Sequence, residues 1–217
     1  MPCQFEAKPR WERRKDARPQ ELLEAAIDLF VERGYAATRL EDVARRAGVS
    51  KGTLYLYYEN KEELFKAVVR SNIVPAIGEA EASVAEFEGH SADLLRHLIH
   101  SWWQRLGATK ASGIIKLIMA ESDNFPELAC FYQEEVINRG TAATSRMLER
   151  AVERGEFRPM DITLMTQVLV APMLMLITWK HSVGPCPRAE LEPLAFLDTF
   201  LDMALNGLLP PAAKPAA

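Results

Sequence analysis

One stretch of this chain, residues 38–65, constrains its fold more than any other. It reads TRLEDVARRAGVSKGTLYLYYENKEELF. Thr38 followed by Glu41 predicts a capping box, in which a hydroxyl and a carboxylate each take an unpaired backbone N–H group at a helix start. Gly48 predicts a left-handed helix end. Two further helix starts follow, with capping side chains at Ser50 and Asn60.

These signals predict two short helices around a glycine turn, which is the helix-turn-helix arrangement that reads DNA. Gly52 lies in the first turn of the second helix, between Lys51 and Thr53. A glycine inside a helix costs about 1 kcal/mol relative to alanine. One explanation is that the cost is smaller in the first turn of a helix. The other is that the missing side chain lets the helix start approach a phosphate or a base edge, and the neighbouring lysine and threonine favour this second explanation.

Residues 18–70 resemble the DNA-binding domain of the TetR family of bacterial transcription regulators. The first helix, residues 21–35, has that family's ending A-x-x-L-F-x-x-x-G-Y, and residues 49–55 match its recognition helix. Tyr57-Tyr58 is a mild departure, since His-Phe or Tyr-Phe is more usual there. We expect Lys51, Gly52, Thr53 and Tyr55 to face bases or phosphates, and Ser50 mainly to cap. The resemblance implies backbone contacts from Thr38, Tyr57 and Lys61, and we add their neighbour Arg39.

The charge of the chain is unevenly distributed. The net charge is −4, but residues 1–70 carry 14 Lys and Arg against 12 Asp and Glu. Six of those basic residues precede the first helix, in residues 8–18. We expect residues 1–17 to form a basic, disordered arm, which either contacts phosphates or a minor groove or serves only as a solubilising extension.

The remainder of the chain predicts helices and no strands, so the expected fold is all-α. A three-helix head over residues 18–65 would precede a helical regulatory and dimerisation domain over residues 66–208. Residues 209–217 are Pro- and Ala-rich and predict a disordered tail. Six further helices are predicted after the three helices of the head: 61–87, 91–106, 113–122, 126–154, 162–179 and 191–208. Pro75 and Gly78 could bend or break the first of them.

Residues 162–179 are almost entirely apolar and approach the length of a membrane span. A soluble helix that is apolar on all sides packs on two of them. We therefore expect one side to face the domain core and the other a second subunit, as the TetR resemblance implies. A homodimer would also place two recognition helices in successive major grooves. The candidate interface residues are Leu169, Met173, Leu176, Phe196, Phe200, Met203 and Leu205.

Several large apolar side chains could line a pocket in the second domain. Met adapts its shape and aromatic rings offer flat walls, so a bulky lipophilic or aromatic effector is plausible. Each residue taken singly could equally be ordinary core. The candidates are Trp102, Trp103, Met119, Phe131, Tyr132, Met165, Met175 and Trp179.

Catalytic and metal-binding chemistry find little support. His97 and His100 are spaced i, i+3, but no third ligand stands near them in the sequence. The three cysteines are widely separated and predict reduced thiols. No signal peptide or phosphate-binding loop is apparent. We expect no enzyme activity, no cofactor, no metal, no membrane partner and a cytoplasmic location.

The sequence therefore predicts a homodimeric regulator that binds double-stranded operator DNA. We expect a repressor that a small lipophilic or aromatic molecule releases from its operator. A DNA-binding protein of the same fold without a small ligand, acting through assembly or protein contacts, is the alternative. A further alternative is an enzyme that carries a DNA-binding head of this kind.

Overall fold

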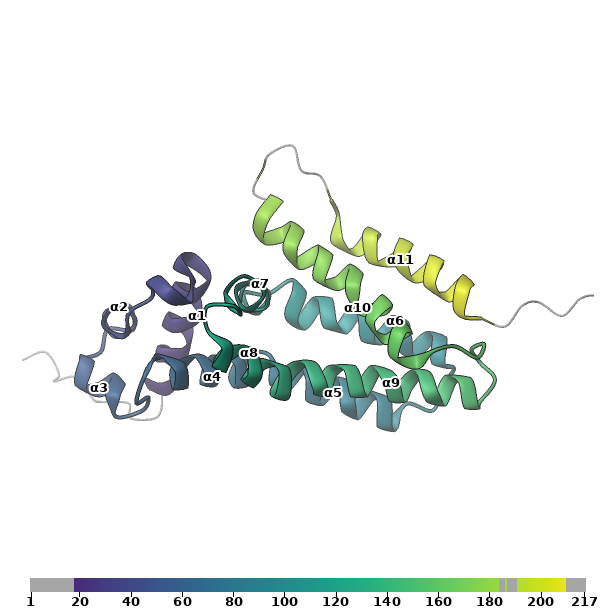
Figure 1. The fold of residues 1–217 in the computed structure, drawn as a ribbon, viewed down its shortest axis with the longest axis horizontal. Coiled ribbons are helices and arrows are strands. Elements are labelled where there is room, and N and C mark those ends of the chain that lie inside the picture. Colours follow the sequence, from purple (N-terminus) through teal and green to yellow (C-terminus); the bar gives the residue numbers. More distant parts are fainter. Residues whose placement is uncertain (1–17, 184–185, 187–190, 210–217) are drawn as a thin grey trace, which may run out of the picture.

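The computed structural model describes residues 18–183, 186 and 191–209, and every regular element among them is helical. The predicted arm 1–17 and most of the predicted tail lie outside the described residues. The predicted all-α fold is confirmed. Figure 1 shows an elongated molecule with α1, α2 and α3 gathered at one end.

The head contains three helices, α1 (Arg18–Ala37), α2 (Leu40–Arg46) and α3 (Lys51–Tyr55). Helix α4 (Lys61–Asn72) follows, so the domain boundary predicted after residue 65 falls inside a continuous helix. Helix α5 (Val74–Glu86) begins after a break at Ile73. Pro75 lies in its first turn, where the missing N–H costs nothing. The interruption predicted near Pro75 is therefore confirmed, whereas Gly78 lies inside α5 without breaking it.

The second part of the chain is built from longer helices. Helix α6 (Ser91–Trp102) continues into a π-helical turn, η1 (Trp103–Gly107), and is followed by α7 (Ala111–Glu121). Helices α8 (Pro126–Tyr132) and α9 (Asn138–Glu153) are joined by a second π-helical turn, η2 (Gln133–Ile137). The predicted helix 126–154 is thus one continuous helical run.

Helices α10 (Ile162–Thr178) and α11 (Pro193–Leu208) end the described fold, with a third π-helical turn, η3 (Trp179–Val183), extending α10. The two helices lie side by side along one flank of the molecule (Figure 1). Residues 162–183 form a helix long and apolar enough to cross a membrane, with mean hydropathy 1.8, although only 22% of an 18-residue stretch of it is buried in the protein. Much of the apolar surface of α10 therefore faces outward.

Apolar packing is continuous between the head and the helices behind it. One core cluster includes Phe30 of α1, Phe65 of α4, Ile114 of α7 and Leu128 of α8. A second cluster joins α6 and α9 to α10 and α11. Because α1 and α4 share a core with α7 and α8, the head is held by the second domain rather than tethered to it.

Candidate nucleic-acid interface and effector cavity

The turn between α2 and α3 has the predicted glycine geometry. Gly48 has φ +67°, the left-handed conformation that a residue without Cβ adopts most easily. Val49 is partly buried and packs against the core, and Leu54 of α3 is fully buried. These contacts set the angle between the two helices and leave the N-terminal end of α3 at the surface.

Helix α3 begins with the cap that the sequence predicts. The Ser50 hydroxyl accepts a hydrogen bond from the Thr53 backbone N–H at 3.1 Å. Asn60 starts α4 in the same way, accepting from the Glu63 N–H at 2.9 Å. A Cβ on Gly52 would meet only the Ser50 hydroxyl at 3.8 Å, so packing within the protein does not require glycine there.

The exposed side of α3 carries a lysine and a row of large side chains. Lys51 forms an ion pair with Glu41 of α2 at 2.5 Å. This contact lowers the pKa of the Glu41 carboxyl and raises the pKa of Lys51. Tyr55 and Tyr57 are exposed, and Leu56 between them is 82% exposed, a position that the sequence reasoning missed.

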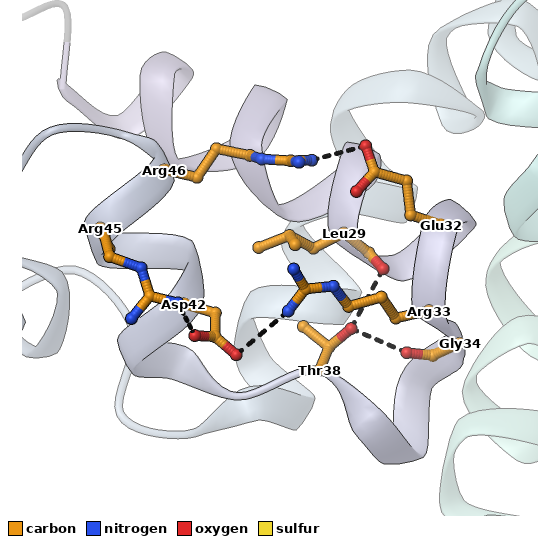
Figure 2. A network of polar contacts seen from close by, with 8 residues as sticks. All are labelled: Leu29, Glu32, Arg33, Gly34, Thr38, Asp42, Arg45 and Arg46. Carbon is orange, nitrogen blue, oxygen red and sulfur yellow. Dashed lines mark hydrogen bonds and ion pairs between the residues drawn. The ribbon is translucent and has the colours of Figure 1, made fainter.

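The predicted capping box at Thr38 is wrong. The N-cap of α2 is Arg39, which makes no side-chain cap bond. The Thr38 hydroxyl instead donates to the carbonyl oxygens of Gly34 at 2.7 Å and Leu29 at 3.2 Å (Figure 2). Thr38 is only 1% exposed, so it closes the end of α1 and is poorly placed for the predicted phosphate contact.

Ion pairs between α1 and α2 surround this buried hydroxyl (Figure 2). Asp42 accepts from Arg33 of α1 at 3.4 Å and also pairs with Arg45. Arg46 reaches Glu32 at 2.7 Å. Arg33 and Arg46 thus connect α1 with α2, and Arg45 pairs within α2. Arg39 is exposed and has no side-chain bond at the helix start.

Lys61, which the resemblance predicts to contact the DNA backbone, has partners inside the protein. Its ammonium donates to the carbonyl oxygens of Tyr35 at 2.7 Å and Ala36 at 3.2 Å. It also lies 4.4 Å from the centre of the Tyr35 ring, and burial lowers its pKa. Lys61 therefore caps the end of α1 from α4, a role that no local pattern reveals because its partners are 25 and 26 residues away.

A cavity of about 630 Å³ lies among α5, α6, α7, α9 and α10. Its walls are mostly apolar, and Ile73, the break between α4 and α5, is part of them. Of the eight predicted pocket residues, Trp102, Met119 and Tyr132 line it.

The other five predicted pocket residues lie outside the cavity wall. Trp103 is buried in the core between α6 and α9–α11, and Met165 packs against that core. Phe131 lies under Lys66 and Arg70 of α4. Met175 is exposed, and Trp179 lies beyond the last lining residues of α10.

A polar row at the cavity wall was missed. His97, Ser101 and Arg105 lie four residues apart on α6 and η1, and all three line the cavity. Arg105 forms an ion pair with Glu79 of α5, another lining residue. The spacing i, i+4, i+8 beside the apolar stripe of residues 91–106 is the signal that could have identified this row.

Four predicted interface residues belong to the protomer's own core. Leu169, Leu176, Phe200 and Leu205 are buried without any partner chain, so a second subunit cannot cover them further. Met173 lines the cavity, and Phe196 packs partly against the core. Met203 alone of the seven is largely exposed, at 67%.

The outward face of α10 carries residues that the sequence reasoning missed. Leu164 is 65% exposed, Val168 is 57% exposed and Met175 is also exposed. Their spacing of four and seven residues places them on one side of the helix. Because α10 is apolar all round, periodicity could not show which side faces outward.

No group of three metal-ligating side chains occurs within the described ranges. His100 pairs with Asp198 of α11 at 2.8 Å, and His97 lies 3.5 Å from the Ser101 hydroxyl. Both histidines therefore have neighbours other than a metal site.

Comparison with known proteins agrees with this geometry. Residues 22–68 match the family described as bacterial regulatory proteins, tetR family. Residues 88–203, more than half of the chain, match the tetracyclin repressor-like C-terminal domain. The chain belongs to the TetR family. It is accordingly a DNA-binding transcription regulator and not an enzyme.

Several similar TetR-family regulators match most of the chain. The uncharacterized regulator YhgD of Bacillus subtilis is 47% identical over 85% of this chain and 96% of its own length. The fatty acid metabolism regulator protein of the same species is 31% identical over 89% and 98%. The crystal structure of Bacillus subtilis FadR in complex with stearoyl-CoA has a TM-score of 0.69 at 19% identity, covering 87% of this chain and 98% of that one.

Proposed function

We propose that this TetR-family regulator is a homodimeric repressor that a long-chain acyl compound releases from its operator. The main support for a small-molecule effector is the apolar cavity of about 630 Å³. This size falls within the roughly 300–1,000 Å³ of small-molecule sites. The similar proteins include a fatty acid metabolism regulator and a complex with stearoyl-CoA, which supports an acyl effector. We place its action in the cytoplasm, with the chromosome.

The proposed DNA contacts come from the exposed part of the head. Lys51, Gly52 and Thr53 form the first turn of α3, and Tyr55, Leu56 and Tyr57 follow at its end. Lysine and backbone N–H groups suit phosphates, whereas an apolar side chain such as Leu56 suits a thymine methyl group. Arg39 adds an exposed cation beside them. Ser50 contributes as the cap of α3.

The proposed release follows from the position of the cavity. Ile73 separates α4 from α5 and also lines the cavity, so an occupant can change the angle at this break. Helix α4 packs against α1 in the shared core. An effector that binds better to the changed angle would therefore shift the two heads away from the spacing that the operator requires.

Gly140 allows a direct test of the cavity. It lines the cavity, and a Cβ added to it meets no atom within 4 Å. Gly140→Leu should therefore occupy part of the space without displacing α9. Gly78→Leu is the matched control, because Gly78 is also inside a helix with no atom near its Cβ but does not line the cavity.

The experiment first measures binding of the purified protein to DNA upstream of its own gene. It then measures release by stearoyl-CoA, by stearate or by choline, which is the ligand in the structure of a putative transcriptional regulator from Saccharomonospora viridis (TM-score 0.74, 18% identity). We expect stearoyl-CoA to release the wild type and Gly78→Leu, and Gly140→Leu to bind DNA but resist release. Failure of all three probes would favour the alternative without a small ligand. Equal release of both variants would show that the effector binds outside this cavity.

A further inference from the structure

A polar cluster outside the cavity joins the end of α10 to the start of α7. The Lys180 ammonium of η3 donates to the Gly107 carbonyl at 2.7 Å, the Thr109 carbonyl at 3.0 Å and the Ser112 hydroxyl at 3.1 Å. An ammonium has three N–H donors, so all of them have acceptors here. Lys180 thereby caps the end of η1 across 68 to 73 residues of sequence.

Ser112 is the centre of this cluster and is fully buried. Its hydroxyl donates to the Thr109 carbonyl at 2.7 Å, so its oxygen is left to accept from Lys180 and from His181 Nε2 at 2.8 Å. Burial lowers the pKa of His181, and the positive charges of Lys180 and Lys116 lower it further. The neutral imidazole with its proton on Nε2 fits these contacts.

The same turn of α7 is held on its other side by the head. Lys110 pairs with Asp28 of α1 at 2.5 Å. Gly113 lies so close to Val31 of α1 that an added Cβ would be 2.6 Å from a Val31 methyl carbon. Four consecutive residues, 110–113, thus connect α1 with the end of α10.

We propose that Lys180, His181 and Ser112, the Lys180 cluster, are positioning residues for operator binding. This inference rests on the proposed homodimer, and it takes the outward face of α10, with Leu164, Val168 and Met175, as the dimer interface. Two heads must be held about 34 Å apart, or a little more, to enter successive major grooves. Hydrogen bonds from Lys180 to α7, and an ion pair and close packing from α7 to α1, restrict that spacing without touching DNA.

The test uses full-length Lys180→Met and Ser112→Ala, with Arg158→Met as the matched control. Arg158 also caps helix carbonyls, but at Gly207 near the end of α11, away from α7. The DNA is an operator duplex selected from a random library by the wild-type protein, the same duplex with its half-site spacing changed by one base pair, and an unrelated duplex.

We expect both cluster variants to raise the Kd for the selected duplex by about two- to thirtyfold. The unrelated duplex should bind as before, because its affinity depends on charge rather than on head spacing. Discrimination between the two spacings should also fall. Arg158→Met should behave as wild type in all three measurements.

An unchanged Kd for the selected duplex in Ser112→Ala, with a folded dimer by circular dichroism and sedimentation, would overturn the proposal. A loss of thermal stability alone, with the ratio of the two affinities unchanged, would also overturn it by showing a purely structural role. A wild-type protein that sediments as a monomer would refute the dimer itself, which is a separate failure.

Discussion

Individual side chains in the head divide between those that face outward and those that close the ends of helices. Thr38 and Lys61 both look like surface contacts in the sequence, yet both bind carbonyl oxygens at the end of α1. Lys51 remains at the surface and is neutralised by Glu41. We therefore expect Glu41 to reduce the attraction of Lys51 for DNA.

Replacing Glu41 with Gln should strengthen binding to unrelated DNA, because Lys51 loses its intramolecular partner. The dependence of log Kd on log salt concentration should become steeper, by up to about one phosphate contact. Glu153→Gln, which removes the same charge from the exposed end of α9, is the control. Identical salt dependence in the two variants would show that Lys51 does not reach phosphate.

Tyr35 should make the head sensitive to alkali. Burial, and then the negative charges of Glu62 and Glu127, raise the pKa of Tyr35 to about 12. The folded state therefore holds the phenol proton more tightly than the unfolded state. The resulting stability is fully present below pH 10 and is lost as the pH rises toward 12.

The free energy of unfolding of wild type, measured in urea at pH 9 and pH 11, should fall over this interval, and by less in Tyr35→Phe. Tyr57→Phe changes an exposed ring and should keep the wild-type dependence. If Tyr35→Phe has the same pH dependence as wild type, the loss of stability at alkaline pH does not come from the buried Tyr35 hydroxyl.

Among the elements, α7 has the closest contact with the head. Gly113 lets α7 approach α1, and the shared apolar core runs through the same contact. The break at Ile73 and the outward face of α10 likewise belong to whole helices and not to single side chains.

Gly113→Ala should destabilise the protein by about 1–3 kcal/mol, because its methyl group would overlap the Val31 side chain. Val31→Ala in the same chain should restore part of the loss by making room. Gly78→Ala is the control, and helix propensity predicts a gain of about 0.5–1 kcal/mol there. Urea unfolding of Gly113→Ala, Val31→Ala, the double variant and Gly78→Ala measures these differences. Additive effects of the two α1–α7 changes would contradict the contact.

At the scale of the whole molecule, the exposed apolar face of α10 and α11 is the candidate surface for assembly. Leu164, Val168 and Met203 are each more than half exposed, so α10 and α11 leave large apolar side chains that a second subunit can bury. Apolar burial of this kind is the main favourable contribution to protein association. We propose that it is the dimer interface.

Val168→Glu should convert the protein to a monomer, because a carboxylate would be buried against the partner subunit. Sedimentation equilibrium measures the mass, and operator affinity should fall with it since one head cannot span two half-sites. Ala85→Glu places the same charge at an exposed position of α5 and should remain dimeric. A dimeric Val168→Glu would place the interface elsewhere.

Local chemistry determined the glycine turn of the helix-turn-helix and the starts of α3 and α4. Gly48, Ser50 and Asn60 act on backbone groups within three residues of themselves, and the structure places each as the pattern predicts. The all-α fold and most helix bounds follow from the same short-range periodicity.

Only the tertiary structure decided where side chains with distant partners point. Thr38, Lys61 and Lys180 satisfy carbonyl oxygens on other elements, and nothing in their own neighbourhood specifies this. The same holds for α10, whose uniform apolar surface allows any side to face outward until α6, α9 and α11 cover the others. Bonds between residues close in sequence can be predicted from those residues alone. Which face of an apolar helix points outward depends on the other helices that pack against it.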